Sequence, residues 1–159
     1  MSCIRVLHHT GRMWEAIDNA ASLVRSGGRL FIAIYNDQGR ASRVWTMIKR
    51  AYNILPRPLR FLVLWPAALR LWGPTTIRDF FAFRPFGTWR EYRRNRGMSP
   101  WRDVVDWVGG YPFEVARPEE IFERCRSKGF RLTRMTTNAG GLACNQFVFT
   151  LDRMNLPGK

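Results

Sequence analysis

The chain of 159 residues is 46% hydrophobic and 24% charged, and 26 Lys and Arg against 12 Asp and Glu give it a net charge of +14. A chain of this length buries enough surface for one folded core, and its composition excludes a disordered polypeptide. The widely separated Cys3, Cys125 and Cys144 exclude a disulfide framework, and the longest apolar run, residues 61–69, is too short to cross a membrane, so we expect a cytoplasmic protein.

Residues 1–39 have the pattern of an α/β fold. Residues 4–7 are typical of the end of a strand, 8–11 of a loop, 13–24 of an amphipathic helix, and 29–35 of a strand that is covered on both faces. Strand, helix and buried strand in this order form part of a right-handed crossover. We therefore expect a parallel sheet that is covered by helices.

Residues 40–96 change to helical segments that proline and glycine interrupt, and we interpret them as a helical lid inserted between sheet elements. The apolar stripe Val44, Ile48 and Tyr52 predicts the first helix. The following segments predict a helix over 58–73 that is kinked near Pro66, and short helices over 75–82 and 88–95.

Sheet elements return after residue 97. Ser99 and Pro100 are typical of a helix N-terminus, and a further helix is predicted over 118–128. Residues 130–136 and 145–151 predict an antiparallel pair of strands. We therefore expect residues 1–39 and 97–153 to form the core, with residues 154–159 as a tail.

Three segments outside the predicted lid resemble class I S-adenosylmethionine-dependent methyltransferases. Residues 6–37, VLHHTGRMWEAIDNAASLVRSGGRLFIAIYND, resemble the fourth strand, the following helix and the fifth strand of that family. Residues 96–130, RGMSPWRDVVDWVGGYPFEVARPEEIFERCRSKGF, resemble a bacterial branch of ubiquinone-biosynthesis-like and general small-molecule enzymes. The segment CNQFVFTL, residues 144–151, is similar to the final strand of these enzymes.

The resemblance implies a partial Rossmann-like methyltransferase sheet, strands 4 to 7 of the family order 3-2-1-4-5-7-6, with the last strand antiparallel. The family's glycine-rich cofactor turn follows its first strand and should therefore precede Met1. Gly27-Gly28, Gly109-Gly110 and Gly140-Gly141 do not occupy a strand-to-helix turn. We expect the C-terminal half of a methyltransferase, with a bare strand at the sheet edge, little activity alone, and a complementing N-terminal half as a candidate partner.

His8 and His9 follow the first predicted strand, a place that in the family lies near the transferred methyl group. The resemblance therefore implies catalytic roles for His8 and His9, and contacts of Leu7 and His8 with the cofactor, S-adenosylmethionine. The alternative is a loop histidine whose ring is satisfied by backbone hydrogen bonds.

Tyr35 and Asn36 end the next predicted strand at the same sheet edge and are candidates to orient a small-molecule acceptor, with a lipophilic acceptor as one option. Tyr111, after a double glycine, and Asn145, at the start of the final strand, are further candidates for substrate binding. The alternatives are a core role for Tyr35, a turn-forming role for Asn36, a helix cap at the double glycine and a hairpin cap at Asn145.

The excess of arginine leaves a second hypothesis open, a non-enzymatic basic module that binds nucleic acid or an anionic membrane. Residues 88–96, TWREYRRNR, interleave basic and aromatic side chains, but no recognised nucleic-acid module accompanies them, so we expect no specific nucleic acid partner. Residues 58–72 could lie on a membrane surface. No spacing of His, Cys, Asp or Glu predicts a metal site.

Overall fold

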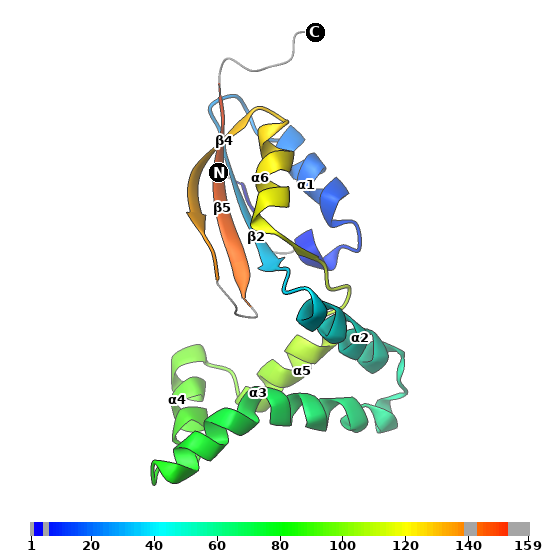
Figure 1. Cartoon of the computed structure of the whole chain (residues 1–159), viewed down its shortest axis with the longest axis vertical. Coiled ribbons are helices and arrows are strands. Elements are labelled where there is room, and N and C mark those ends of the chain that lie inside the picture. Colours follow the sequence, from blue (N-terminus) through cyan, green and yellow to red (C-terminus); the bar gives the residue numbers. More distant parts are fainter. Residues whose placement is uncertain (1, 5–6, 139–142, 153–159) are drawn as a thin grey trace. The chain divides into compact units, whose positions relative to one another are not determined.

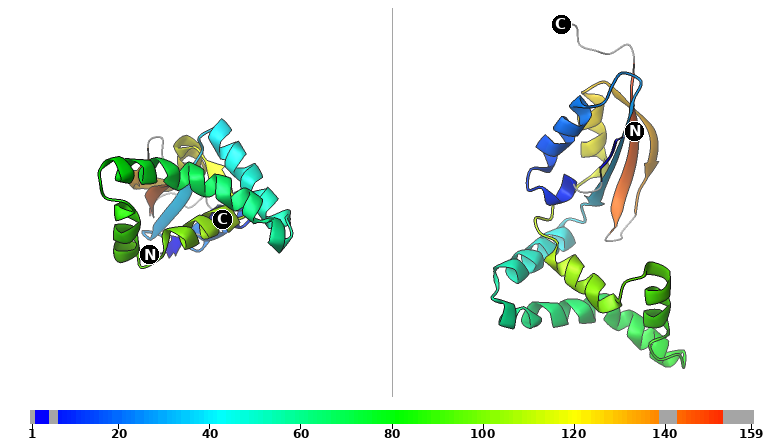
Figure 2. Two further views of the ribbon diagram at one scale, coloured as in Figure 1. Left: turned by 90° about the horizontal axis from the view of Figure 1, so that it is seen from below. Right: turned by 180° about the vertical axis from the view of Figure 1, so that it is seen from behind.

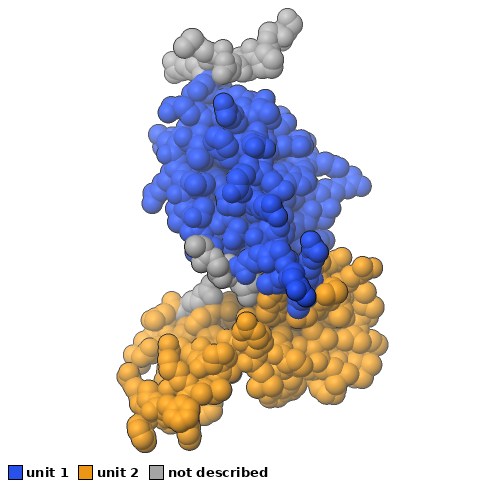
Figure 3. Space-filling model, in the orientation of Figure 1, with its two compact units in different colours: residues 1–44, 112–159 blue, residues 45–111 orange. Residues whose placement is uncertain are grey.

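The structure, a computed structural model, describes residues 2–4, 7–138 and 143–152. The chain divides into two compact units (Figure 3). Unit 1 consists of residues 1–44 and 112–159, and unit 2 consists of residues 45–111. The predicted tail, 154–159, lies outside the described residues.

Unit 1 is built on a mixed β-sheet (Figure 1). Strands β1 (Ser2–Ile4), β2 (Arg29–Asn36), β5 (Cys144–Leu151) and β4 (Phe130–Thr136) lie side by side in that order, and the short β3 (Val115–Ala116) pairs with the end of β2. Strands β1 and β3 run parallel to β2, whereas β5 runs antiparallel to both β2 and β4. The fold is therefore α/β, with a sheet consistent with part of a Rossmann-like fold.

The predicted antiparallel pair is confirmed as β4 and β5; residues 139–142 between them lie outside the described part of the chain. The predicted end of the first strand is wrong for Leu7, because Leu7–His9 form a 3-10 turn, η1, after β1 ends at Ile4. The predicted loop before residue 118 contains β3, which is held by pairing with Tyr35 and Asn36 rather than by a local pattern.

Two helices, α1 (Met13–Ser22) and α6 (Pro118–Arg126), cover one face of the sheet (Figure 2). Alternate residues of β2 and β5 point to this face, as the twofold period of a strand requires. The buried core contains residues from both helices and four strands: Leu7, Met13, Ile17, Ala20, Ala21, Leu30, Ile32, Ile34, Ala116, Ile121, Cys125, Phe130, Phe147, Phe149 and Leu151.

The opposite face of the sheet is only partly covered. Phe31 and Val148 are half-buried there and, with Arg134, Thr136 and Gln146, line a shallow hollow of about 140 Å³. The strand predicted over 29–35 is confirmed as β2, and within unit 1 the described helices cover one of its two faces. Apolar residues of this strand that face α1 and α6 are buried by those helices. Those on the other face are not covered by any described helix of unit 1.

The two rims of the sheet differ. At one rim, β4 carries the exposed Arg131 and Arg134 and has an irregular register against β5 between Leu132 and Arg134. At the other rim, β1 pairs with β2 and is the last strand of the order among the described residues. Bulges and charged side chains discourage a rim strand from pairing with another chain.

A bidentate ion pair joins α1 to α6. Arg124 donates from Nε and Nη2 to the two carboxylate oxygens of Asp18, at 2.9 and 2.6 Å, and Lys128 Nζ lies 3.2 Å from Asp18 Oδ1. The hydrogen bond from Arg124 is the main cause that holds the pKa of Asp18 below its ordinary value of 3.8. The Arg124 guanidinium also lies 5.7 Å from the ring centre of Trp14.

Unit 2 is helical. Most of α2 (Arg40–Ile54) belongs to it, followed by the 3-10 turn η2 (Arg57–Leu59) and the helices α3 (Phe61–Phe81), α4 (Gly87–Arg96) and α5 (Pro100–Gly109). Among the described residues, none of the helices combines the length and apolar character that a membrane span requires.

Helix α3 continues through both Pro66 and Pro74, so the separate short helix predicted over 75–82 is wrong. Contacts with α4 hold α3 on both sides of Pro74. Before it, the Trp72 ring lies 5.3 Å from that of Trp89; after it, Thr76 Oγ1 accepts a hydrogen bond from Trp89 Nε1 at 3.2 Å. These tertiary contacts outweigh the local preference of proline to end a helix.

Helix α5 packs with the other helices of unit 2, although we expected residues 97–111 to belong with the sheet. Its Trp101 and Trp107 rings lie 5.5 Å from Trp65 and 5.8 Å from Trp45. The predicted N-cap is confirmed, since Ser99 Oγ accepts from the Arg102 N–H at 3.2 Å. The helical unit therefore spans 45–111, whereas the predicted insertion spans 40–96.

The core of unit 2 contains a lysine. Lys49 on α2 is 1% exposed, donates from Nζ to the Trp107 carbonyl, and lies 4.0 Å from the centre of the Trp107 ring. Burial lowers its pKa from 10.5 to about 8. The ammonium is thus stabilised by a carbonyl and an aromatic face, but less well than by water.

Replacing Asp18 by Asn should lower the free energy of unfolding at neutral pH by about 1 kcal/mol, because the side chains of the pair are partly exposed. The pKa of Asp18 is lowered in the folded state, so its contribution is present above pH 3.8 and is lost as the pH falls through the lower folded value. Urea unfolding should therefore show the two proteins converging in acid. Glu15→Gln, in an exposed pair with Arg12, should change little.

Lys49 should make unfolding pH-dependent in alkali. Because its pKa is about 8 when folded and 10.5 ordinarily, the free energy of unfolding should rise between these pH values, by roughly 3 kcal/mol in total. Lys49→Met should lack this rise in urea unfolding measured across that range. A wild-type curve parallel to that of Lys49→Met would contradict a lowered pKa. The difference between the two proteins in the free energy of unfolding removes the contributions of all titratable groups that they share.

Candidate functional site

The turn η1 places two histidines beside the ends of the parallel strands β1 and β2. The Leu7 side chain, 5% exposed, belongs to the core, and its carbonyl accepts a hydrogen bond from Thr10 Oγ1 at 2.8 Å. The predicted cofactor contact of Leu7 would therefore have to use its backbone, since its side chain anchors the turn.

His8 is buried, with 3% of its surface exposed, and its Nδ1 lies 3.2 Å from the Ala33 carbonyl. A carbonyl oxygen only accepts hydrogen bonds, so Nδ1 carries the proton. In the neutral ring the lone pair is then on Nε2. A hydrogen bond to β2 thus fixes both the tautomer and the direction of the ring.

His9 is held in the same way by a different segment. Its Nδ1 lies 2.7 Å from the carbonyl of Pro112, so this nitrogen also donates. One nitrogen of each ring is thus held by a backbone hydrogen bond, as the structural alternative for a loop histidine requires. These bonds are compatible with a catalytic role, because they orient the second nitrogen.

The two imidazoles form a cluster with two aromatic rings. The His8 ring centre lies 4.4 Å from that of His9 and 4.4 Å from that of Tyr35, and the Tyr35 ring lies 5.1 Å from that of Phe113. We call these four residues the histidine cluster. Most contacts are edge-to-face, an arrangement that favours aromatic pairs.

Residues 112–116, which we call the strap, fasten this cluster to the sheet. The Glu114 N–H donates to the His8 carbonyl at 3.0 Å, and the Ala116 carbonyl accepts from the Asp37 N–H at 3.2 Å. The Glu114 carboxylate accepts from the Met13 N–H, with both oxygens within 3.2 Å. The carboxylate thus accepts from an N–H that has no partner within α1, and its negative charge complements the dipole of the helix.

Asn36 and Asn145 form a separate amide network. Asn145 is 1% exposed; its Nδ2 donates to Asn36 Oδ1 at 3.0 Å, and its Oδ1 accepts from the Asn138 N–H at 3.0 Å. Asn138 Nδ2 in turn donates to the Cys144 carbonyl at 2.9 Å. These bonds give both predicted substrate residues a role in closing the end of the β4–β5 hairpin, and substrate binding remains a prediction for them.

Six of the seven predicted site residues thus lie in unit 1, near the end of β2: Leu7, His8, His9, Tyr35, Asn36 and Asn145. The seventh, Tyr111, belongs to unit 2 and is 43% exposed. Sequence reasoning placed Phe113 beside Tyr111 as part of a wall over the substrate but missed Glu114. Glu114 and Met13 are 101 residues apart, so no local pattern connects them.

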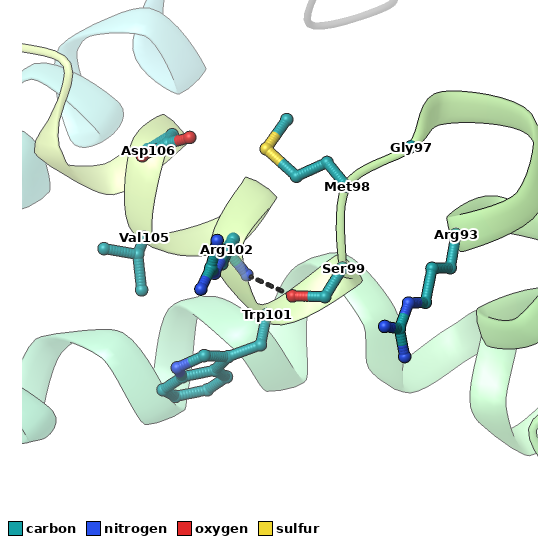
Figure 4. Close-up of a pocket in the computed structure, with 8 residues that line it drawn as sticks. All are labelled: Arg93, Gly97, Met98, Ser99, Trp101, Arg102, Val105 and Asp106. Carbon is teal, nitrogen blue, oxygen red and sulfur yellow. Dashed lines mark hydrogen bonds between the residues drawn. The ribbon is translucent and has the colours of Figure 1, made fainter.

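A larger hollow, of about 930 Å³, lies in unit 2 between the end of α4 and the first turns of α5 (Figure 4). It contains no predicted site residue. Its walls carry two arginines, one aspartate and apolar side chains, and Ser99 is already engaged as the N-cap. The lining residues are Arg93, Gly97, Met98, Ser99, Trp101, Arg102, Val105 and Asp106.

Neither a cluster of metal-ligating side chains nor the core thiol of Cys125 marks a site among the described residues. No three His, Cys, Asp or Glu side chains among them are grouped as a metal ion would require. Burial raises the pKa of the Cys125 thiol to about 12, so this core cysteine is protonated at neutral pH. Comparisons of the chain with protein-family models, with curated proteins and with solved structures found no match.

Replacing Glu114 by Ala should lower the free energy of unfolding by about 1 kcal/mol, the usual effect of losing a helix N-cap. Glu114→Gln should lower it less, because its amide oxygen can still accept from Met13 while the charge is lost. Urea unfolding measures both. Glu123→Ala, on the exposed side of α6, is the matched control and should change stability by less than either. Equal effects at 114 and 123 would contradict the capping role.

Proposed function

We propose that residues 1–159 carry the acceptor-side part of a class I S-adenosylmethionine-dependent methyltransferase. The observation that supports this best is the strand order β1-β2-β5-β4 with β5 antiparallel. It agrees with the order 4-5-7-6 expected for the second half of the family sheet. A reversed neighbour between β2 and β4 is a specific feature, since α/β sheets with helical crossovers otherwise favour parallel strands.

The position of the histidine cluster also supports the proposal. In open α/β sheets, ligands bind outside the carboxyl ends of the parallel strands. His8, His9 and Tyr35 lie at that end of β1 and β2, where the resemblance leads us to expect the transferred methyl group. Both the topology of the sheet and the types of residue therefore favour this end of β1 and β2 as the site of the reaction.

Methyl transfer is an in-line displacement. A lone pair of the acceptor forms a bond to the methyl carbon while the carbon–sulfur bond breaks, and S-adenosylhomocysteine leaves. Most of the acceleration comes from alignment of the two reactants. Where the acceptor must lose a proton, we assign its removal to Nε2 of His8, because Nδ1 donates to Ala33 and holds the lone pair on the other nitrogen.

The cofactor itself needs residues from elsewhere. Within the part of the chain that the structure describes, Gly27-Gly28 precede β2 and Gly109-Gly110 end α5, so neither pair forms a strand-to-helix turn that could approach the cofactor. We infer that the cofactor half comes from additional polypeptide, whose strands pair along β1. The apolar Phe31 and Val148 on the other sheet face would then be covered by the helices of that half.

The alternative of nucleic-acid binding has less support. In α4, the aromatic rings that interleave with the arginines are directed to other parts of unit 2. The Trp89 and Tyr92 rings lie 5.3 and 4.9 Å from Trp72, and Tyr92 Oη donates to Asp103 at 2.7 Å. Stacking on bases would require these rings to be available.

The proposal is tested by joining residues 1–159 to the polypeptide encoded directly upstream, or by co-expressing the two. The combined protein should bind S-adenosylmethionine in calorimetry, and residues 1–159 alone should not. An upstream sequence without a strand, glycine-rich turn and helix would contradict the proposal. Micromolar binding by residues 1–159 alone would contradict the assignment of the cofactor site to another half.

In the combined protein, His8→Gln should lower the rate of methyl transfer by about 10²- to 10⁴-fold, the range of general-base catalysis. The acidic limb of the pH–rate profile should disappear with it. Because His8 is buried, thermal unfolding must accompany the assay. A reduced rate with an unchanged pH profile would assign His8 a structural role only.

A further inference from the structure

Helix α3 carries an apolar stripe that faces solvent. We define the stripe as Phe61, Leu62, Trp65, Leu69, Ile77 and Phe80, whose exposed fractions range from 52% to 70%. At about 100° per residue, these six positions fall within roughly 160° of the helix circumference. Large apolar side chains scattered singly on a surface are common, whereas an aligned set of this size marks an interaction site.

The stripe overlaps only in part with the surface by which α3 packs, since Trp65 is the stripe residue whose ring lies 5.5 Å from that of Trp101 on α5. The buried residues of α3 are Leu64, Ala67, Ala68 and Asp79. Leu64 and Ala68 lie one turn apart, on a side of the helix that is rotated away from Leu62 and Leu69. The packing of unit 2 therefore leaves the stripe exposed.

The apolar surface extends from α3 to the hollow in α4 and α5. Trp101 is 39% exposed, and its ring lies 5.5 Å from that of Trp65 in the stripe. Trp101 also lines the hollow, together with Arg93 of α4 and Arg102 of α5 (Figure 4). An apolar surface is thus adjoined by a recess with two guanidinium groups and one carboxylate, that of Asp106, a net positive charge that suits a phosphate; we call it the basic recess.

Unit 2 concentrates the positive charge of the chain. Residues 45–111 contain 12 Lys and Arg against four Asp and Glu, a net charge of +8 out of +14. Among the acidic residues, Asp79 is buried and accepts hydrogen bonds from Thr88, so it contributes little to the surface. Arg57 and Arg70, near the stripe in sequence, are exposed.

The exposed apolar stripe and the positive charge of unit 2 together favour an anionic lipid surface as its binding partner. Two copies of unit 2 would bring like charges together, which disfavours self-association. A helix that lies in the membrane interface has apolar and aromatic residues on one side and basic residues at its flanks. Arginine stems can also bury their methylenes while the guanidinium reaches the phosphates.

We propose that unit 2 binds to the surface of anionic bilayers. Helix α3 lies in the interface with its apolar stripe among the acyl chains, and Arg93 and Arg102 bind a lipid phosphate. This inference does not depend on methyl transfer. It would, however, bring the chain to lipophilic molecules dissolved in a membrane.

The test is sedimentation of the full chain with phosphatidylcholine vesicles, with and without phosphatidylglycerol. Binding should require the anionic lipid. Leu62→Ser with Leu69→Ser should weaken it about tenfold or more, because two side chains no longer enter the acyl region. The matched control is Leu23→Ser, since Leu23 is 79% exposed in unit 1.

The basic recess is tested separately. Arg102→Gln should weaken binding about fivefold, whereas Arg25→Gln, exposed in unit 1, should not. In the wild type, lipids brominated in their acyl chains should quench tryptophan fluorescence, and Trp65→Phe should reduce that quenching. Circular dichroism checks that each variant is folded.

Three results would overturn the inference. Vesicle binding that vanishes at moderate salt and ignores the Leu62 and Leu69 substitutions would indicate adsorption by charge alone. A dimer that the same substitutions dissociate would assign the stripe to a second copy of the chain. If the chain bound neither kind of vesicle, the stripe would instead be assigned to contact with a protein partner. None of these results bears on S-adenosylmethionine binding, so the two proposals can fail independently.

Discussion

The candidate site depends on the strap, residues 112–116, because it connects elements that are far apart in the sequence. One residue, Glu114, uses its N–H to hold the carbonyl of His8 and its carboxylate to hold the start of α1. The neighbouring Pro112 carbonyl accepts from His9. Without these bonds, the histidine turn would be held to the sheet mainly by the hydrogen bond between His8 Nδ1 and the Ala33 carbonyl. The strap therefore fixes the backbone of His8 and the imidazole of His9, while the hydrogen bond to Ala33 orients the imidazole of His8.

The two units are stabilised by different means. Unit 1 buries alternate apolar side chains of its sheet under two helices, and a bidentate ion pair joins those helices. Unit 2 relies on aromatic contacts between helices, and it even accommodates the charge of Lys49 against a tryptophan ring. This aromatic packing uses Trp65 of the stripe but leaves all six stripe side chains at least half exposed, so α3 both supports its own unit and offers an apolar surface.

The sequence predicts best those elements whose signals are local. The period of α1, the apolar run of β2 and the cap at Ser99 each lie within a few residues, and all three elements are present. Prediction fails where distant contacts decide. Pro74 remains inside α3 because α4 holds both sides of it, and β3 exists only through its pairing with β2. The positions of His8 and Tyr35 follow from topology, whereas the role of Glu114 cannot be inferred from its neighbours.

The unequal rims of the sheet give its assembly a direction. The irregular register and the exposed Arg131 and Arg134 make β4 a poor template for another strand, whereas β1 offers an ordinary parallel partner. Any enlargement of this sheet should therefore proceed from the N-terminal side alone. Such polarity would make recruitment of extra strands selective, because a strand that approaches the edge with Arg131 and Arg134 would meet charged side chains and an irregular register.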